Sequence, residues 1–197
     1  MSQSRSAKIV RTTTETDINV SLNLDGKGSY ILDTGVPFLD HMLALWSRHG
    51  LFDLEITADG DTGIDDHHTV EDVGICLGQA IKDALGDKAG IKRYGTAFAP
   101  MDEALAMVVV DISGRAYLSF DAEIPAQKVG DFDTELVEEF MRALANHADL
   151  TLHIRLLSGK NTHHIIEAIF KGLGRAIKEA VALDEKIEGV LSTKGQL

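Results

Sequence analysis

Residues 67–81 read HHTVEDVGICLGQAI, and residues 163–177 read HHIIEAIFKGLGRAI. The two segments align without a gap, and both begin with a histidine pair that a glutamate follows three residues later. Apolar residues recur in both at helical spacing, so each is predicted to lie in a long helix, over residues 65–86 and 161–183. A match of this length within one chain indicates an internal duplication.

Two further blocks extend the duplication. Residues 39–56 align with 137–154 at an offset of 98, and residues 15–28 align with 103–116 at an offset of 88. For the helices above the offset is 96, so the loop before the second helix is two residues shorter than that before the first. Because three blocks agree in order, we interpret the chain as two copies of one unit.

Each copy has the same predicted elements. Alternating or continuous apolar residues indicate strands, and apolar residues at helical spacing indicate a short helix before the long one. The strand segments are 18–24, 51–57, 104–112 and 150–156, and the short helices are 36–49 and 133–147. The 104–112 segment is the more continuously apolar, so we expect a more buried strand there.

We interpret each unit as β-β-β-α-β-α, and two copies predict an α+β fold with helices packed between two sheets. We expect the first repeat to occupy residues 1–90 and the second residues 91–186. Residues 187–197 would form a C-terminal tail that contacts substrate.

The composition narrows the function. The 197 residues are 44% hydrophobic, which allows a real core, and the net charge of −12 argues against binding nucleic acid or anionic membranes. The single Cys76 fits a reducing compartment. No segment has the apolar length of a signal peptide or a membrane span, so we expect a cytoplasmic protein.

The HHxxE motif is suited to binding metal ions. On a helix, Glu71 lies one turn from His67 and His68, but the two histidines diverge by about 100°. Each histidine can therefore share an ion with the glutamate, and the pair points to two different ions. The second copy repeats this with His163, His164 and Glu167. Repetition disfavours the alternative that these are unliganded surface residues.

The short helices supply further candidate ligands. His41 is matched across the repeat by Glu139, and both residue types bind metals. Imidazole and carboxylate without thiolate fit Mn²⁺, Fe²⁺, Co²⁺ or Zn²⁺, and the extra carboxylates favour Mn²⁺.

Other polar residues have structural interpretations. His49 and His147 match across the repeat near helix ends, where a cationic imidazole complements the helix dipole. Asp65 and Asp66 are expected to cap the following helix.

Several cations and a pair of acids stand out in this acidic chain. Arg93, Arg115 and Lys194 lie near glycine or serine turns, and Lys171 lies one turn after Glu167. The stretch STKG, with Ser192, Thr193 and Lys194, resembles a flexible anion clamp. Glu15 and Glu103 match across the repeat and are candidates for a base or a ligand of a substrate hydroxyl.

Taken together, GVPFLDHML, DDHHTVEDVGI, RYGTAFAPMDEAL, DISGRAYLSF, KNTHHIIEAIFKGLGRAI and LSTKG resemble the imidazoleglycerol-phosphate dehydratase family. The resemblance runs from about residue 7 to the C-terminus, without the phosphatase domain of bifunctional members. It implies a duplicated ribosomal-protein-S5-domain-2-like fold, and a homo-oligomer of 24 chains built from trimers, with active sites between subunits.

The resemblance also implies a chemistry. D-erythro-imidazoleglycerol phosphate would lose water to give imidazole acetol phosphate, with two Mn²⁺ ions per site holding the ring as an imidazolate. The implied ligands are His41, His67, His68, Glu71, Glu139, His163, His164 and Glu167. The chain departs from the family at Glu139, where many members have histidine.

The implied substrate contacts are Glu15, Arg93, Arg115, Lys171, Ser192, Thr193 and Lys194, together with the histidines of the ligand set. Glu15, Glu71 and Glu167 are candidates for the acid–base group, and the lowered basicity of metal-bound carboxylates mildly favours Glu15.

Two other functions are compatible with the ligands. A di-metal hydrolase would use a bridging water to attack a phosphorylated small molecule. A metal-linked structural assembly would need no catalysis, but it would also need no cations for a phosphate.

Overall fold

The computed structural model describes residues 5–197 and contains the predicted unit twice. The first copy consists of β1 (Ser6–Thr12), β2 (Thr16–Asn23), β3 (Tyr30–Asp33), α1 (Pro37–Gly50), β4 (Asp53–Gly60) and α2 (His67–Leu85). The second consists of β5 (Tyr94–Met101), β6 (Ala104–Asp111), β7 (Tyr117–Asp121), β8 (Lys128–Val129), β9 (Phe132–Asp133), α3 (Leu136–His147), β10 (Thr151–Ser158) and α4 (Thr162–Val181).

Both copies fold with one topology, which confirms the duplication. The first sheet has the order β1-β2-β4-β3 and the second the order β5-β6-β10-β7. In each sheet the first three strands are antiparallel, and the last strand pairs in parallel with its neighbour. Along the chain, the short helix α1 connects the parallel strands β3 and β4, and α3 lies between the parallel strands β7 and β10.

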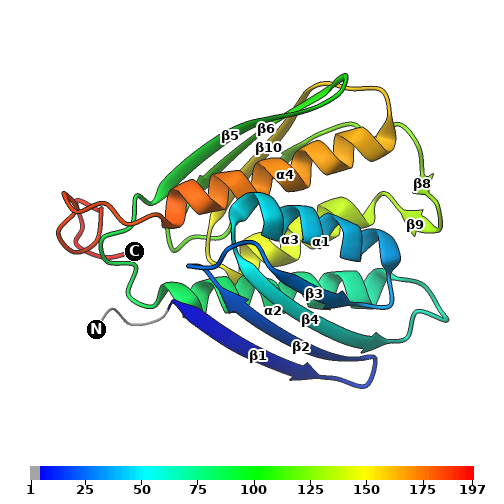
Figure 1. Ribbon diagram of the computed structural model, residues 1–197, viewed down its shortest axis with the longest axis horizontal. Helices are drawn as coiled ribbons and strands as arrows, with labels where there is room; N and C mark the ends of the chain where they lie inside the picture. Colours follow the sequence, from blue (N-terminus) through cyan, green and yellow to red (C-terminus); the bar gives the residue numbers. More distant parts are fainter. Residues whose placement is uncertain (1–4) are drawn as a thin grey trace.

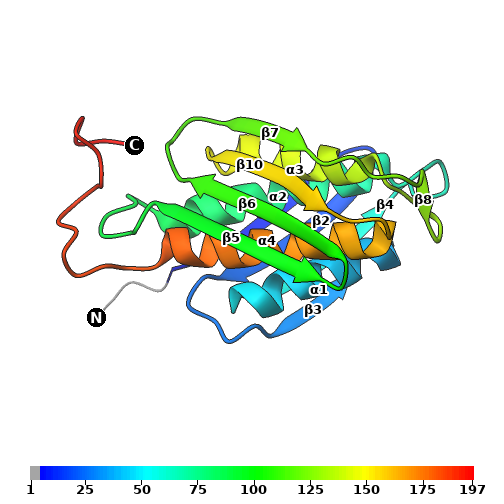
Figure 2. The same cartoon turned by 90° about the horizontal axis from the view of Figure 1, so that it is seen from above.

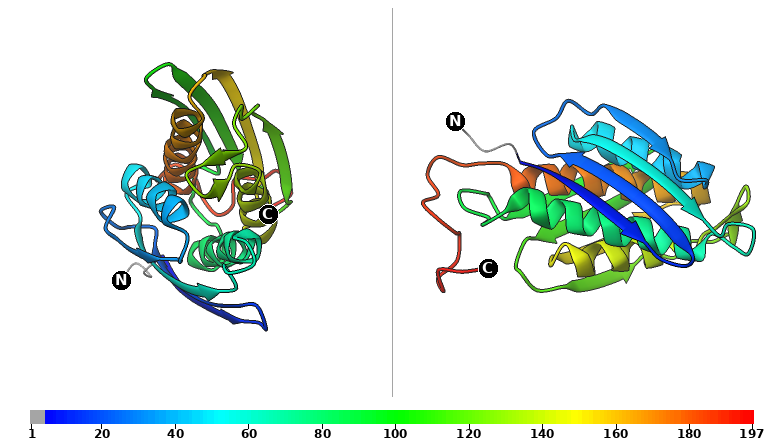
Figure 3. Two further views of the ribbon diagram at one scale, coloured as in Figure 1. Left: turned by 90° about the vertical axis from the view of Figure 1, so that its right-hand side faces the viewer. Right: turned by 90° about the horizontal axis from the view of Figure 1, so that it is seen from below.

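The four helices lie between the two sheets, as the sequence predicted (Figures 1 and 3). Helix α4 packs under β5 and β6, and α2 packs on β1 and β2. Figure 2 shows the second sheet lying over α4 and α3. Helices α1, α2 and α4 all begin at one end of the molecule, and the C-terminal tail lies at the opposite end (Figure 1).

Strand periodicity produces this layering. In β2, Ile18, Val20 and Leu22 are buried while the residues between them face outward. Strand β6 buries every second residue and only half exposes the others, which confirms the prediction of a more buried strand. In the described part of the chain, no helix combines the length and apolar character needed to cross a bilayer.

A small hairpin was not predicted. Between the first block and the short helix, the repeat offset rises from 88 to 98, so the second copy holds ten extra residues there. These residues contain β8 and β9, which pair with each other and join neither large sheet. Two-residue strands carry too little periodicity to be recognised in a sequence.

Cys76 gives a chemical test of this packing. Its side chain is fully buried in α2, and burial raises the pKa of the thiol to about 11. At pH 8 the native thiolate fraction is then about 200-fold below that of an ordinary cysteine. We expect iodoacetamide to label the native protein at least that much more slowly than the urea-unfolded protein. Similar labelling rates in the two states would contradict the packing of α2.

Candidate active site

Three of the predicted metal ligands converge. His41 of α1 meets His163 and Glu167 of α4 where these helices begin. His41 Nε2 is 3.2 Å from Glu167 Oε1, and His163 Nε2 is 4.0 Å from the same oxygen. One donor atom of each residue lies within 4.8 Å of the other two. Two imidazoles and a carboxylate at this spacing suit a divalent first-row metal such as Mn²⁺.

The carboxylate of Glu167 is the buried centre of this cluster, since the residue is only 6% exposed. Lys171 Nζ lies 3.2 Å from Glu167 Oε2 and 3.2 Å from Met101 Sδ. A buried carboxylate needs such a partner, because burying an unpaired charge is costly. Within the chain, Lys171 therefore belongs to the ligand cluster and lies apart from the tail.

His164, at the start of α4, is held by Glu103. The Nδ1 atom of His164 lies 2.8 Å from Glu103 Oε2, while Glu103 Oε1 accepts hydrogen bonds from the backbone N–H groups of Lys160 and Asn161 at 3.1 and 2.7 Å. These bonds, chiefly that from His164, lower the pKa of Glu103 to about 2. Glu103 in turn raises the pKa of His164. A carboxylate on Nδ1 fixes the ring and makes Nε2 the more basic donor for a metal.

The equivalent His68, at the start of α2, has two acidic neighbours. Its Nδ1 atom lies 2.9 Å from Asp61 Oδ2 and 3.8 Å from Glu15 Oε2. The hydrogen bond to Asp61 is the main cause of the raised pKa of His68. Glu15 is therefore placed beside a predicted ligand, as proposed from the repeat, but outside hydrogen-bonding distance.

The remaining predicted ligands do not come together at one point within the described residues. The rings of His67 and His68 are 6.1 Å apart and nearly perpendicular, at 89°. Among residues 5–197, His41, His163 and Glu167 are the only three that meet at metal-binding distance, so His67, Glu71 and Glu139 form no second cluster. Glu139 Oε2 instead lies 4.0 Å from the Nε atom of Arg142.

The caps of the two long helices correct one prediction. Asp65 accepts a hydrogen bond from the backbone of His67 at 2.9 Å, as Asn161 does from His163 in the second copy. Asp66 makes no cap hydrogen bond, so its predicted capping role is wrong. Its backbone is already helical, whereas a capping side chain needs an extended backbone such as that of Asn161. Partial burial and nearby acids raise the pKa of Asp66.

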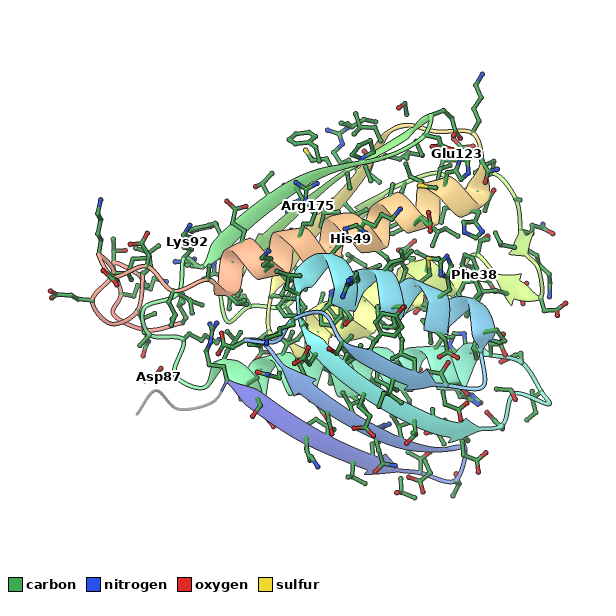
Figure 4. The ribbon with its side chains drawn as sticks, viewed as in Figure 1. Phe38, His49, Asp87, Lys92, Glu123 and Arg175 are labelled. Atoms are coloured by element: carbon green, nitrogen blue, oxygen red, sulfur yellow. The ribbon has the colours of Figure 1, made fainter. Side chains whose placement is uncertain are left out.

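The two histidines near helix ends differ from each other. His147 Nδ1 lies 2.9 Å from the carbonyl oxygen of Ala143, which fits the predicted role at the end of α3. His49 lies in the last turn of α1, as predicted, but partial burial and the nearby Lys171 and Arg175 lower its pKa. Figure 4 shows His49 and Arg175 on neighbouring faces of α1 and α4.

The predicted anion-binding residues share one cavity, except for Lys171. An open cavity of about 880 Å³ is lined by Arg93, Arg115, Ser192, Thr193 and Lys194. Arg93 is bound to Asp111 at 2.7 and 3.1 Å and donates to the carbonyl of Leu191 at 2.8 Å, so it also fixes the tail.

Within the described residues, two of the predicted cations in this cavity are unpaired. In the described part of the chain, neither the guanidinium of Arg115 nor the ammonium of Lys194 has an ion-pair or hydrogen-bond partner. Unpaired cations in a chain of net charge −12 form a local site for an anion such as phosphate.

The ligand cluster and this cavity lie at opposite ends of the molecule. The backbone N–H of Arg93 bonds to the carbonyl of Ala180, sixteen residues after His164 on the same helix. At 1.5 Å per residue, α4 separates the two sites by roughly 24 Å. Figure 4 shows this separation, with Phe38 at the ligand end and Lys92, next to Arg93, at the tail end. One small substrate cannot span both sites of one chain.

Sequence reasoning missed two residues of the ligand end. Asp61 was not recognised as the partner of His68, although the repeat offset placed two extra residues in its loop. Phe38 was not considered, yet its ring packs edge-on against His163 at 5.3 Å. An apolar residue beside a helix start gives no chemical signal in a sequence.

Known proteins match the chain over nearly its whole length. The family model described as imidazoleglycerol-phosphate dehydratase matches residues 34–177. A relative of that name from Geobacillus kaustophilus is 62% identical over 193 residues, covering 98% of this chain and 99% of the relative. Another from Clostridium novyi is 63% identical over 185 residues, covering 94% of each.

Solved structures agree. The crystal structure of imidazoleglycerol-phosphate dehydratase from Staphylococcus aureus is 49% identical and superposes with a TM-score of 0.83, covering 91% of this chain and 99% of that one. That of the Pyrococcus furiosus protein in complex with (S)-C348 is 41% identical with a TM-score of 0.83, covering 96% and 100%. The chain therefore belongs to the imidazoleglycerol-phosphate dehydratase family.

Proposed function

We propose that this dehydratase of histidine biosynthesis converts D-erythro-imidazoleglycerol phosphate into imidazole acetol phosphate, with two Mn²⁺ ions in each active site. The cluster of His41, His163 and Glu167 carries the proposal, because it assembles a predicted ligand set around one buried carboxylate. Bound metal ions would supply Lewis-acid stabilisation of the charge that develops on the substrate's imidazole ring.

The ligand residues fit such ions. The rings of His68 and His164 each have Nδ1 next to a carboxylate, which leaves Nε2 to bind a metal. The divergence of His67 and His68 by about 100° around the helix axis favours two ions over one. Ligation by His67, Glu71 and Glu139 is part of the proposal and requires a neighbouring chain to complete the second ion.

The reaction needs one proton acceptor near the ring. The hydroxyl on the carbon next to the ring leaves as water, the following carbon loses its proton, and the resulting enol becomes the ketone. We assign the proton removal to Glu15. Its side chain is half exposed, and among the described residues its carboxylate makes no hydrogen bond. The alternative Glu167 is engaged by His41 and Lys171.

The substrate phosphate would bind in the cavity of Arg115, Lys194, Ser192 and Thr193. Because this cavity lies roughly 24 Å from the ligands of the same chain, the ring and the phosphate must be held by different chains. Exposed apolar side chains on the outer sheet faces, among them Phe98, Tyr117, Ile31 and Val10, support such an assembly. We propose the 24-chain particle built from trimers that the family resemblance implies.

The competing functions lose their support. Membership of a dehydratase family makes the chain a hydro-lyase, so neither a di-metal hydrolase nor a metal-linked assembly without catalysis is retained. A cytoplasmic location remains our proposal, with the single buried Cys76 as its support.

The direct test is product formation. Metal-free protein loaded with Mn²⁺ should convert imidazoleglycerol phosphate into an enolisable ketone, which absorbs strongly in alkali. His164→Asn should remove the activity, because it removes a proposed metal ligand. Absence of product at every metal loading would refute the proposed reaction, and a fully active His164→Asn particle would refute this ligand.

Lys194 tests the phosphate site. A charge-assisted hydrogen bond contributes about 1.5–3 kcal/mol, so Lys194→Ala should raise KM by roughly 10–100-fold. The value of kcat should change much less, because the phosphate does not react. The control is Lys8→Ala, which removes an exposed lysine from strand β1. An unchanged KM in Lys194→Ala would exclude this lysine from the site.

A further inference from the structure

Glu15 and Glu103 occupy equivalent positions in the two repeats but have different partners. Glu103 is fully engaged, with one carboxylate oxygen on the Nδ1 atom of His164 and the other on two backbone N–H groups. Glu15 stands 3.8 Å from the Nδ1 atom of His68 and makes no side-chain hydrogen bond in the described part of the chain. In the first repeat, a residue other than Glu15 must therefore make the hydrogen bond to Nδ1 of the histidine that Glu103 makes in the second.

Asp61 is that residue. It lies in the loop between β4 and α2, where the repeat alignment has two more residues than before the second HHxxE motif. Its Oδ2 atom is 2.9 Å from His68 Nδ1, and its backbone N–H donates to the carbonyl of Glu15 at 3.1 Å. In the second repeat, the strand alignment puts Gly159 at this position, which has no side chain to offer His164.

We infer that Asp61 is a positioning residue that holds His68 through Nδ1 and thereby leaves the Glu15 carboxylate free to act on the substrate. An imidazole Nδ1–H makes one strong hydrogen bond, so two carboxylates compete for it. The nearer, Asp61, has it at 2.9 Å, and Glu15 is left beyond hydrogen-bonding distance. The inference rests on the proposed function of Glu15 and explains why only one of two equivalent glutamates is available.

Mn²⁺ affinity separates the two glutamates without reference to catalysis. Partners that orient a ligand histidine typically change metal affinity by about 10–100-fold. In titrations of metal-free protein with Mn²⁺ followed by electron paramagnetic resonance, Glu103→Ala should raise Kd by that factor. Glu15→Ala should leave Kd within about 2-fold of the wild type, although its activity should be lost. Equal losses of Mn²⁺ affinity in the two variants would overturn the inference.

Asp61 variants test the competition itself. In Asp61→Ala, Glu15 should move onto His68, so Mn²⁺ affinity should fall only a few-fold while kcat falls about 10–100-fold. Removing both side chains, in Asp61→Ala with Glu15→Ala, should then weaken Mn²⁺ binding about 10–100-fold. A double variant that binds Mn²⁺ as well as Asp61→Ala would overturn the inference.

Asp61→Asn is the conservative variant, because its amide oxygen can still accept from Nδ1–H. It should keep Mn²⁺ affinity and most of kcat, and circular dichroism should show native folding. Failure of the wild-type protein to form product would refute the proposed function. Normal product with equal Mn²⁺ losses in Glu15→Ala and Glu103→Ala would refute only the role given to Asp61.

Discussion

Mixed particles of two inactive variants are expected to recover activity. His164→Asn removes a ligand at one end of the chain, and Arg115→Ala removes a cation at the other. Each alone should lower kcat/KM by roughly 100-fold or more. If one site takes its ligands from one chain and its cations from another, about a quarter of the sites in an equal mixture keep both wild-type halves. The mixture should therefore show about 25% of wild-type activity.

The experiment requires exchange of subunits, which removal and return of Mn²⁺ should allow. Its control mixes Arg115→Ala with Lys194→Ala, two changes in the same cavity, and the activity of this mixture should not exceed the mean of its two components. Recovery in the first mixture alone supports a site shared between chains. If the first mixture remains as inactive as its components, ligands and cations must act within one chain, and the 24 Å separation would have to close by a large rearrangement.

The fold could be predicted from the sequence because both halves of the chain show the same pattern of apolar residues. Alternation in residues 18–24 and helical spacing in the two HHxxE segments define elements, and equal spacing in both halves defines the repeat. The offset changes were informative too. The rise from 88 to 98 corresponds to an insertion, which holds the β8–β9 hairpin, although the hairpin was not predicted because its strands are so short.

The candidate site could be predicted only in part from the sequence. Helical angles predict that His67 and His68 point in different directions, because both lie on one helix. They could not show that His41 meets Glu167, since this contact depends on the packing of α1 against α4. The partner of His68 was hidden for another reason, because Asp61 has no equivalent in the second repeat. The helix start also misled, since adjacent Asp65 and Asp66 look alike in sequence but differ in backbone conformation.

A close crossing of α1 and α4 supports the ligand cluster. Gly174 of α4 lies against α1, and a Cβ atom there would stand 2.5 Å from the carbonyl oxygen of Trp46 and 3.1 Å from the backbone nitrogen of Gly50. These are backbone atoms, so they cannot turn aside. Gly174→Ala should therefore force α1 away from α4. Such overpacking costs about 3 kcal/mol, and the higher helix propensity of alanine returns only about 1 kcal/mol.

The net loss of about 2 kcal/mol should lower Tm by roughly 4–8 °C for a chain of this size. Calorimetry at equal protein concentration, without metal, measures it. Gly78 is the repeat equivalent, where a Cβ atom would stand 2.7 Å from the carbonyl oxygen of Leu144, and Gly78→Ala should behave similarly. Gly63→Ala is the matched control, since its Cβ would meet nothing within 4 Å.

His41 lies on α1 and Glu167 on α4, the two helices that pack together at Gly174. Gly174→Ala should therefore also weaken Mn²⁺ binding. Gly78→Ala lies at the crossing of α2 and α3, so it should leave Mn²⁺ binding by this cluster unchanged. Equal Mn²⁺ affinity in all three glycine variants would show that the ligands tolerate movement of α1, and that the close crossing serves stability alone.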